Sequence, residues 1–65
     1  MKIDSIKIKL LLVEQGINQS GLAERCGIAR QNISAMLTRG TCSIATVGKL
    51  AKALCVSTSE IIKED

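Results

Sequence analysis

A chain of 65 residues with a formal net charge of +3 has the length of one domain, which buries only roughly 60% of its unfolded surface and leaves little room for a deep catalytic pocket. It has no histidine, tyrosine or tryptophan and only six acidic side chains. Because few groups are available for proton transfer, we expect that the protein is not an enzyme. The apolar fraction is 46%, but no run approaches the ~20 apolar residues of a membrane span and the start lacks the pattern of a signal peptide, so we expect a cytoplasmic protein without membrane association.

The hydrophobic periodicity is helical along the whole chain, and no proline interrupts it. It predicts one all-α domain over residues 1–65, a compact arrangement of five short helices. Four of these run over about 4–15, 19–26, 30–38 and 44–54, and the fifth follows Ser57. Ser57 with Glu60 three residues later has the pattern of a capping box, which predicts the start of that last helix.

Local signals mark the ends of the first four helices. Gly16, Gly27 and Gly40 follow the first three of them, and glycine readily adopts the positive φ that ends a helix. Asn18 and Ser43 stand where the second and fourth helices need an N-cap, because their side chains can accept a hydrogen bond from a backbone amide of the first turn.

The second and third helices are joined by only three residues, 27–29, which predicts a steep crossing. Ala23 provides a small side chain where the two helices approach. Ile33 and Met36, three residues apart, anchor one face of the third helix to the core. This is the pattern of a helix-turn-helix, in which the outward residues of the second member enter a DNA major groove. The outward residues here are Arg30, Gln31, Ser34 and Ala35.

The basic residues are concentrated in one part of the chain. Between Glu24 and Glu60 there is no acidic residue, whereas five basic ones fall there: Arg25, Arg30, Arg39, Lys49 and Lys52. A local excess of this kind creates a positive surface field that suits an acidic partner such as nucleic acid. The alternative is a solvated basic surface without a partner.

The three cysteines do not suggest a metal site. Cys26, Cys42 and Cys55 form no Cys-x-x-Cys pair, and no histidine is present to complete a zinc tetrahedron. We expect free thiols in a reducing compartment, and neither a metal nor another cofactor. Two of the thiols are expected to fill small apolar spaces, with Cys26 buried.

The stretch NQSGLAERCGIARQNISAML, residues 18–37, resembles the two-helix motif of the phage-repressor-like helix-turn-helix family, the lambda repressor, Cro and XRE group. With ATVGKLAKALCVSTSEII resembling that family's fourth and fifth helices, the similarity covers about residues 6–63. It implies a lambda-repressor-like fold and a sequence-specific regulator that binds double-stranded DNA, a repressor that occupies an operator. Because one module covers few base pairs, it also implies a homodimer on an inverted repeat.

The resemblance further implies which residues contact DNA. Those expected to read bases from the third helix are Arg30, Gln31, Asn32, Ser34 and Ala35. The residues expected to contact phosphates are Asn18, Gln19, Arg39, Thr41 and Ser43. For Gln19 the alternative role is to brace the third helix. No ligand-binding segment follows the helices, so we expect no small-molecule ligand.

The chain departs from the family pattern at several positions. Many members pair a buried arginine on the first helix with a glutamate late in the third, where this chain has Leu12 and Leu37, and an apolar contact is expected instead. Cys55 replaces a common glycine after the fourth helix, which costs roughly 1 kcal/mol if its backbone is left-handed. Gly21 and Gly48 lie inside helices at a cost on the order of 1 kcal/mol each.

The first helix has two apolar stripes where one can face the core. The second stripe comprises Ile3, Ile6, Leu10 and Val13. The interpretation that we favour from sequence is that the last helix, through Ile61 or Ile62, folds back over part of it. The alternative is a surface for a homodimer or another partner, and with it a protein-interaction module of the antitoxin or anti-repressor type.

Overall fold

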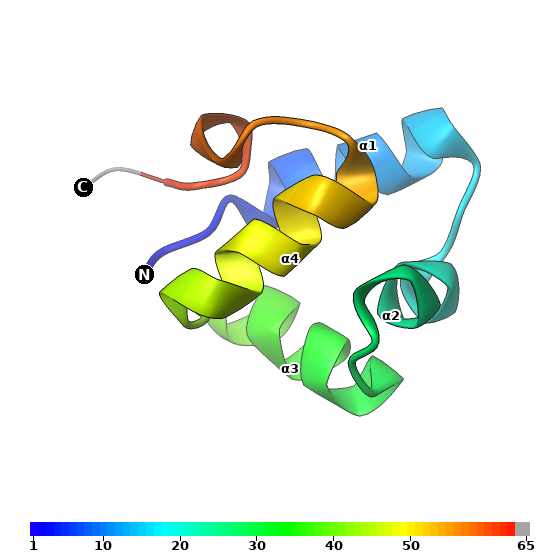
Figure 1. Cartoon of the computed structure of the whole chain (residues 1–65), viewed down its shortest axis with the longest axis horizontal. Helices are drawn as coiled ribbons and strands as arrows, with labels where there is room; N and C mark the ends of the chain where they lie inside the picture. Colours follow the sequence, from blue (N-terminus) through cyan, green and yellow to red (C-terminus); the bar gives the residue numbers. More distant parts are fainter. Residues whose placement is uncertain (64–65) are drawn as a thin grey trace.

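The computed structural model describes residues 1–63 and is built from helices around one core. The elements are α1 (Ser5–Gln15), α2 (Gln19–Cys26), α3 (Arg30–Arg39), α4 (Ile44–Leu54) and a single 3-10 turn, η1 (Thr58–Glu60). Figure 1 shows α4 running between α1 and α3, with α2 beside them and the first residues of the chain close to residues 61–63 on one side. Over residues 1–63 there is no β-strand, and no helix is long and apolar enough to span a membrane.

The prediction of an all-α fold is confirmed, but the predicted fifth helix is wrong. Its place is taken by η1, and the Ser57 hydroxyl does not accept an amide as a capping box requires; it lies 2.8 Å from the Ser59 hydroxyl instead. The reason is tertiary. The Ile61 carbonyl accepts the Asp4 amide at 2.7 Å, and the Lys63 amide donates to the Lys2 carbonyl at 3.0 Å. These two groups pair with the N-terminal segment, so helical bonding does not continue beyond the turn.

The other predicted helix ends are confirmed in position and in chemistry. The side chains of Asn18 and Ser43 accept amides of the first turns of α2 and α4. Helices α1, α2 and α4 each end in a left-handed residue followed by an apolar one, whose amide reaches back to a carbonyl five residues earlier. These bonds run from Ile17 to Leu12, from Ile28 to Ala23 and from Val56 to Ala51. The three apolar residues pack against the core, so each helix end also fixes the direction of the next segment.

Cys55 adopts the left-handed conformation, with φ of 58° and ψ of 38°, at the position where α1 and α2 have glycine. We expect Cys55→Gly to raise the free energy of unfolding by about 0.5–1 kcal/mol, because glycine takes this conformation without a steric penalty. Urea denaturation measures the change. Cys55→Ser keeps the Cβ and serves as the control, and an equal effect of both variants would show that the thiol matters and not the backbone.

Gly48 lies inside α4 with no atom within 4 Å of the place where a Cβ would stand. We expect Gly48→Ala to stabilise the fold by about 1 kcal/mol, since alanine is the better helix former and restricts the unfolded chain. Thermal unfolding should show a rise of about 4–8 °C. Gly16 has equally open space but a φ of 67°, so Gly16→Ala is the matched control and should destabilise. A loss of stability in both variants would contradict this explanation.

The core is apolar throughout. Ile33 and Met36 are buried as predicted, and so is Ala23. Leu12 and Leu37, which replace the ion pair found in many family members, are both 5% exposed. No polar or charged side chain is buried among residues 1–63. The burial of both leucines fits the expected replacement of an ion pair by apolar packing.

The second apolar stripe of α1 is covered only at Ile3. This residue precedes the helix, and its amide donates to the Gly40 carbonyl at 2.9 Å, while it also forms an isolated bridge with Ile62. Its side chain is therefore drawn into the core and is 2% exposed. The favoured interpretation holds for Ile3 alone, because the remaining members of the stripe, Ile6, Leu10 and Val13, are exposed.

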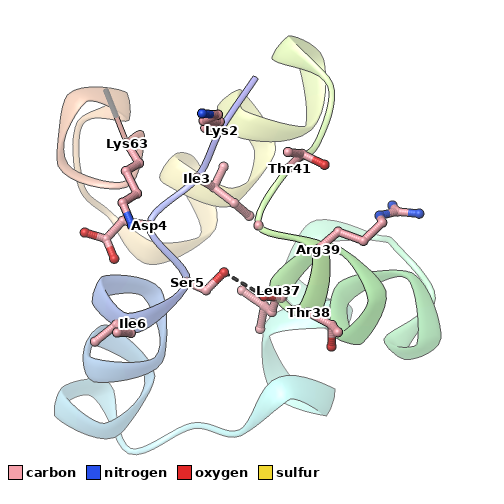
Figure 2. A pocket seen from close by; sticks show the side chains of 11 residues that line it. Lys2, Ile3, Asp4, Ser5, Ile6, Leu37, Thr38, Arg39, Thr41 and Lys63 are labelled. Atoms are coloured by element: carbon pink, nitrogen blue, oxygen red, sulfur yellow. Dashed lines mark hydrogen bonds between the residues drawn. The ribbon is translucent and has the colours of Figure 1, made fainter. Parts of the chain in front are cut away.

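Polar side chains tie the helices together around this core. The Ser5 hydroxyl at the start of α1 donates to the Leu37 carbonyl of α3 at 2.7 Å (Figure 2). At the other end of α1, the Gln15 amide donates to the Leu54 carbonyl at 2.7 Å. These two bonds hold α1 against the ends of α3 and α4, and so help to fix the position of α3.

Candidate nucleic-acid interface

The position of α3 is set by the short connection from α2. Gly27 is left-handed with φ of 68°, and α3 begins only three residues later, at Arg30. Ala29 precedes α3 in an extended conformation without a side-chain cap. Because Ile33 and Met36 hold the inner side of α3 in the core, the opposite side must face outward. The N-terminal half of α3 is thereby held as a rigid polar surface.

The structure places four of the five predicted base-reading residues on the exposed surface, and Ala35 is half-buried. Within residues 1–63 the Arg30 guanidinium has no hydrogen-bond or ion-pair partner, and neither Gln31 nor Asn32 uses its side-chain amide. Unpaired donors and acceptors on a rigid helix are available to a ligand without the loss of an internal contact. The chemical groups fit bases: a guanidinium matches guanine O6 and N7, and an amide matches adenine N6 and N7.

A polar hollow of about 460 Å³ lies between the N-terminal ends of α2 and α3. It brings predicted residues of both classes together with one that the sequence did not single out, Ser20; its lining is Asn18, Gln19, Ser20, Arg30 and Ser34. The first amides of a helix have no carbonyl partner within that helix, so those of α2 can donate to an anion here. Asn18 uses its Oδ1 to accept the Gly21 amide at 2.9 Å, which leaves its NH₂ group as a donor.

Gln19 is half-buried in this hollow, and its side chain forms no hydrogen bond with α3 in the described part of the chain. Of the two roles expected for Gln19, bracing of α3 by a hydrogen bond is therefore not found. The side-chain amide remains available for a phosphate contact.

A second hollow, of about 420 Å³, lies on the other side of α3, against the beginning of α4. Four residues predicted to contact DNA line it: Asn32, Ala35, Arg39 and Ser43. Thr46 and Lys49 also line it, and the sequence reasoning did not assign them to the site. Their spacing of three residues after the Ser43 cap was the available signal, since such residues share one face of a helix.

Ser43 is already engaged within the protein. Its hydroxyl oxygen accepts the Thr46 amide at 3.2 Å and lies 2.8 Å from the Thr46 hydroxyl. This bonding caps α4. Arg39 and Lys49 line the same hollow, so an anion near Ser43 would meet their positive charges in addition to the hydroxyl.

Arg39 and Thr41 lie at the far end of α3, where the chain turns toward α4. Figure 2 shows Arg39 extending away from the body of the protein, and Thr41 on the loop beside the N-terminal segment. Both are exposed. Backbone bonds of 3.0 Å between Met1 and Cys42, one in each direction, hold this loop. Of the two predicted phosphate contacts at this end, Arg39 is the last residue of α3, and Thr41 sits on a loop whose neighbours Gly40 and Cys42 bond to the N-terminal segment.

The positive segment predicted from the sequence does not act as one surface. Arg25 forms hydrogen bonds within the protein: its Nη1 donates to Gln15 Oε1 at 3.0 Å and to the Ala53 carbonyl at 3.4 Å. Arg30 lines the first hollow, whereas Arg39 and Lys49 line the second. The charge next to the exposed side of α3 therefore comes from three cations, on both sides of the helix.

The thiols are free, and burial of Cys26 is less complete than expected. Cys26 and Cys42 are half-buried and Cys55 is exposed. Burial raises the pKa of the Cys26 thiol, against the opposing charge of Lys49, and it raises the pKa of Cys42 against the N-terminal ammonium. A raised pKa keeps both thiols protonated and unreactive near neutral pH. Residues 1–63 hold no cluster of three or more metal-ligating side chains.

Comparison with protein families agrees with this arrangement. A sequence profile of the helix-turn-helix family matches residues 8–61, which include all four α-helices except the start of α1. A search of curated proteins and a search of solved structures gave no match. The match covers most of the chain, and the family binds double-stranded DNA. The chain therefore belongs to the phage-repressor-like helix-turn-helix family of DNA-binding regulators.

Proposed function

We propose that the protein is a sequence-specific transcriptional repressor that acts in the cytoplasm by occupying an operator. In this proposal α2 and α3 form the helix-turn-helix, and α3 lies in the major groove. Arg30, Gln31, Asn32 and Ser34 read base edges, while the methyl group of Ala35 contacts a thymine methyl. The observation that carries the proposal is the exposed, unpaired polar side of α3, held by buried Ile33 and Met36.

The phosphate contacts come from both sides of α3. On one side Asn18 and Gln19 present side-chain amides and the start of α2. On the other, Arg39 and Ser43 line the hollow at the beginning of α4, and Thr41 lies on the loop before that helix. Anchors on the two flanks of a recognition helix fix its depth and direction in the groove without reading sequence themselves. Because one such module covers few base pairs, we propose that two copies occupy the halves of an inverted repeat.

The experiment that tests DNA reading is selection of bound fragments from random DNA, followed by affinity measurements over a range of salt concentrations. We expect enrichment of one short motif and a steep fall of affinity with salt, since each neutralised phosphate contributes about −0.9 to the logarithmic slope. Arg39→Ala should weaken binding to all sequences and reduce the slope by about 1. Selection without enrichment, or affinity that does not respond to salt, would reject the proposal.

The exposed apolar side chains of α1 favour a second candidate, a protein-interaction module with the same fold. In that case this chain would act as an antitoxin or anti-repressor, and its main ligand would be a protein bound to α1 and not DNA. The salt experiment separates the two, because interaction through an apolar surface does not require salt-sensitive DNA binding.

A further inference from the structure

The largest unexplained feature of the surface is a row of apolar side chains on α1. Ile6, Leu10 and Val13 are 72%, 57% and 77% exposed, and we call these three residues the α1 face. Their spacing of four and three residues puts them on one side of the helix. Single exposed apolar residues are ordinary, whereas a contiguous row marks a contact surface. In Figure 2, Ile6 points outward from α1, at the edge of a hollow that Arg39 also lines.

The charges beside the α1 face are arranged so that the surface can match itself. With about 3.6 residues per turn, Lys7 and Glu14 project from the same flank of the face, one toward each end. Both are exposed, and neither forms an ion pair within residues 1–63. They lie at nearly equal distances along the helix from Leu10, in opposite directions. This flank is therefore positive at one end and negative at the other.

We propose that the α1 face binds the α1 face of a second copy of this chain, with the two helices antiparallel. A two-fold axis near Leu10 then brings Ile6 of each copy against Val13 of the other. Because the same flanks meet in an antiparallel pair, Lys7 of each copy lies beside Glu14 of the second copy, which forms two ion pairs. A parallel pair would place the lysine-bearing ends together, and it would align the helix dipoles unfavourably.

This contact is small and leaves the DNA interface open. Three apolar residues and one ion pair per copy bury less than a stable dimer needs, so we expect a dissociation constant on the order of 0.1 mM. Ile6, Leu10 and Val13 line neither of the two hollows beside α3, so association through α1 leaves both hollows open. It also does not depend on the proposed reading of DNA, and the tests are made without DNA.

The first test is sedimentation equilibrium of the protein over about 10 µM to 1 mM. We expect a monomer–dimer equilibrium that Leu10→Ser weakens at least about tenfold. Ile44 on α4 is 74% exposed, so Ile44→Ser is the matched control and should leave the equilibrium unchanged. Both residues are exposed, so circular dichroism should show folded variants. A strictly monomeric parent, or equal effects of the two variants, overturns the proposal.

The second test decides the direction of the helices by reversing charges. Lys7→Glu and Glu14→Lys should each weaken the dimer about fivefold, because each puts like charges opposite one another, and the double variant should restore it. Lys9 lies on the other flank, where Lys9 of the second copy meets it near the axis. Lys9→Glu therefore exchanges one pair of like charges for another, so it is the matched control and should change the equilibrium less than about twofold. Tighter association of Lys7→Glu, or no recovery in the double variant, rules out the antiparallel pair.

Discussion

Arg30→Ala should weaken binding to the preferred DNA site by about 1–3 kcal/mol, which is about fivefold to more than a hundredfold in affinity. The proposed reason is loss of a guanidinium that donates two hydrogen bonds to one guanine. The guanidinium is exposed and has no partner within residues 1–63, so its removal breaks no internal contact and the fold should keep its stability. The measurement is affinity for the selected site and for each single-base variant of it.

The pattern across sequences distinguishes a base contact from a phosphate contact. With a base contact, the preference should disappear at one base pair while the other positions keep theirs. Arg25→Ala is a control with the same change of charge, because Arg25 bonds to Gln15 and Ala53 instead of facing the first hollow. Uniform weakening on all sequences by Arg30→Ala would assign Arg30 to phosphate and would remove it from the base-reading set.

Ile33→Ala should destabilise the domain by about 2–5 kcal/mol. Ile33 is fully buried and belongs to the inner side of α3, so its truncation leaves a cavity in a core that has few side chains to fill it. A domain of this size has a total stability of only about 3–10 kcal/mol, so a large fraction of the variant should be unfolded at 37 °C. Urea denaturation followed by circular dichroism gives the free energy of unfolding.

The control for Ile33→Ala removes the same atoms from an exposed position. Ile44 is 74% exposed at the start of α4, and Ile44→Ala should change the free energy of unfolding by no more than about 0.5 kcal/mol. Gly48→Ala in the same chain adds back only about 1 kcal/mol, so it should raise the folded fraction and the DNA affinity of Ile33→Ala in part. A stable Ile33→Ala variant would mean that α3 is not held by this side chain.

The sequence was sufficient for most of the local structure. Helix ends depend on residues within one turn of each other. The examples are the left-handed ends at Gly16, Gly27 and Gly40 and the caps at Asn18 and Ser43. Such interactions are encoded by neighbours in the chain, so patterns of residue type predict them. The same holds for the outward side of α3, because burial of Ile33 and Met36 at helical spacing leaves its opposite side to solvent.

The candidate site was less completely predictable. Arg30 and Ser34 of α3 share the first hollow with Asn18 and Gln19 at the start of α2, as the sequence predicts. Thr46 and Lys49 enter the second hollow from α4, where the sequence assigned no residue to the site. Arg25 contributed to the positive segment in the sequence, whereas bonds to α1 and α4 hold it as a structural clamp. Which of several similar cations faces a ligand depends on how the helices cross, and composition does not contain that information.

What the sequence by itself determined was therefore the helical class, the boundaries of four helices, the family and the polar side of α3. The tertiary structure decided the ends of the chain and the surface of α1. A capping-box pattern at Ser57 and Glu60 gave way to a 3-10 turn, because Ile61 and Lys63 pair with the N-terminal segment. The same pairing buried Ile3 and left Ile6, Leu10 and Val13 exposed. Periodicity shows that a helix has two apolar sides, but only contacts between distant segments determine which side is covered.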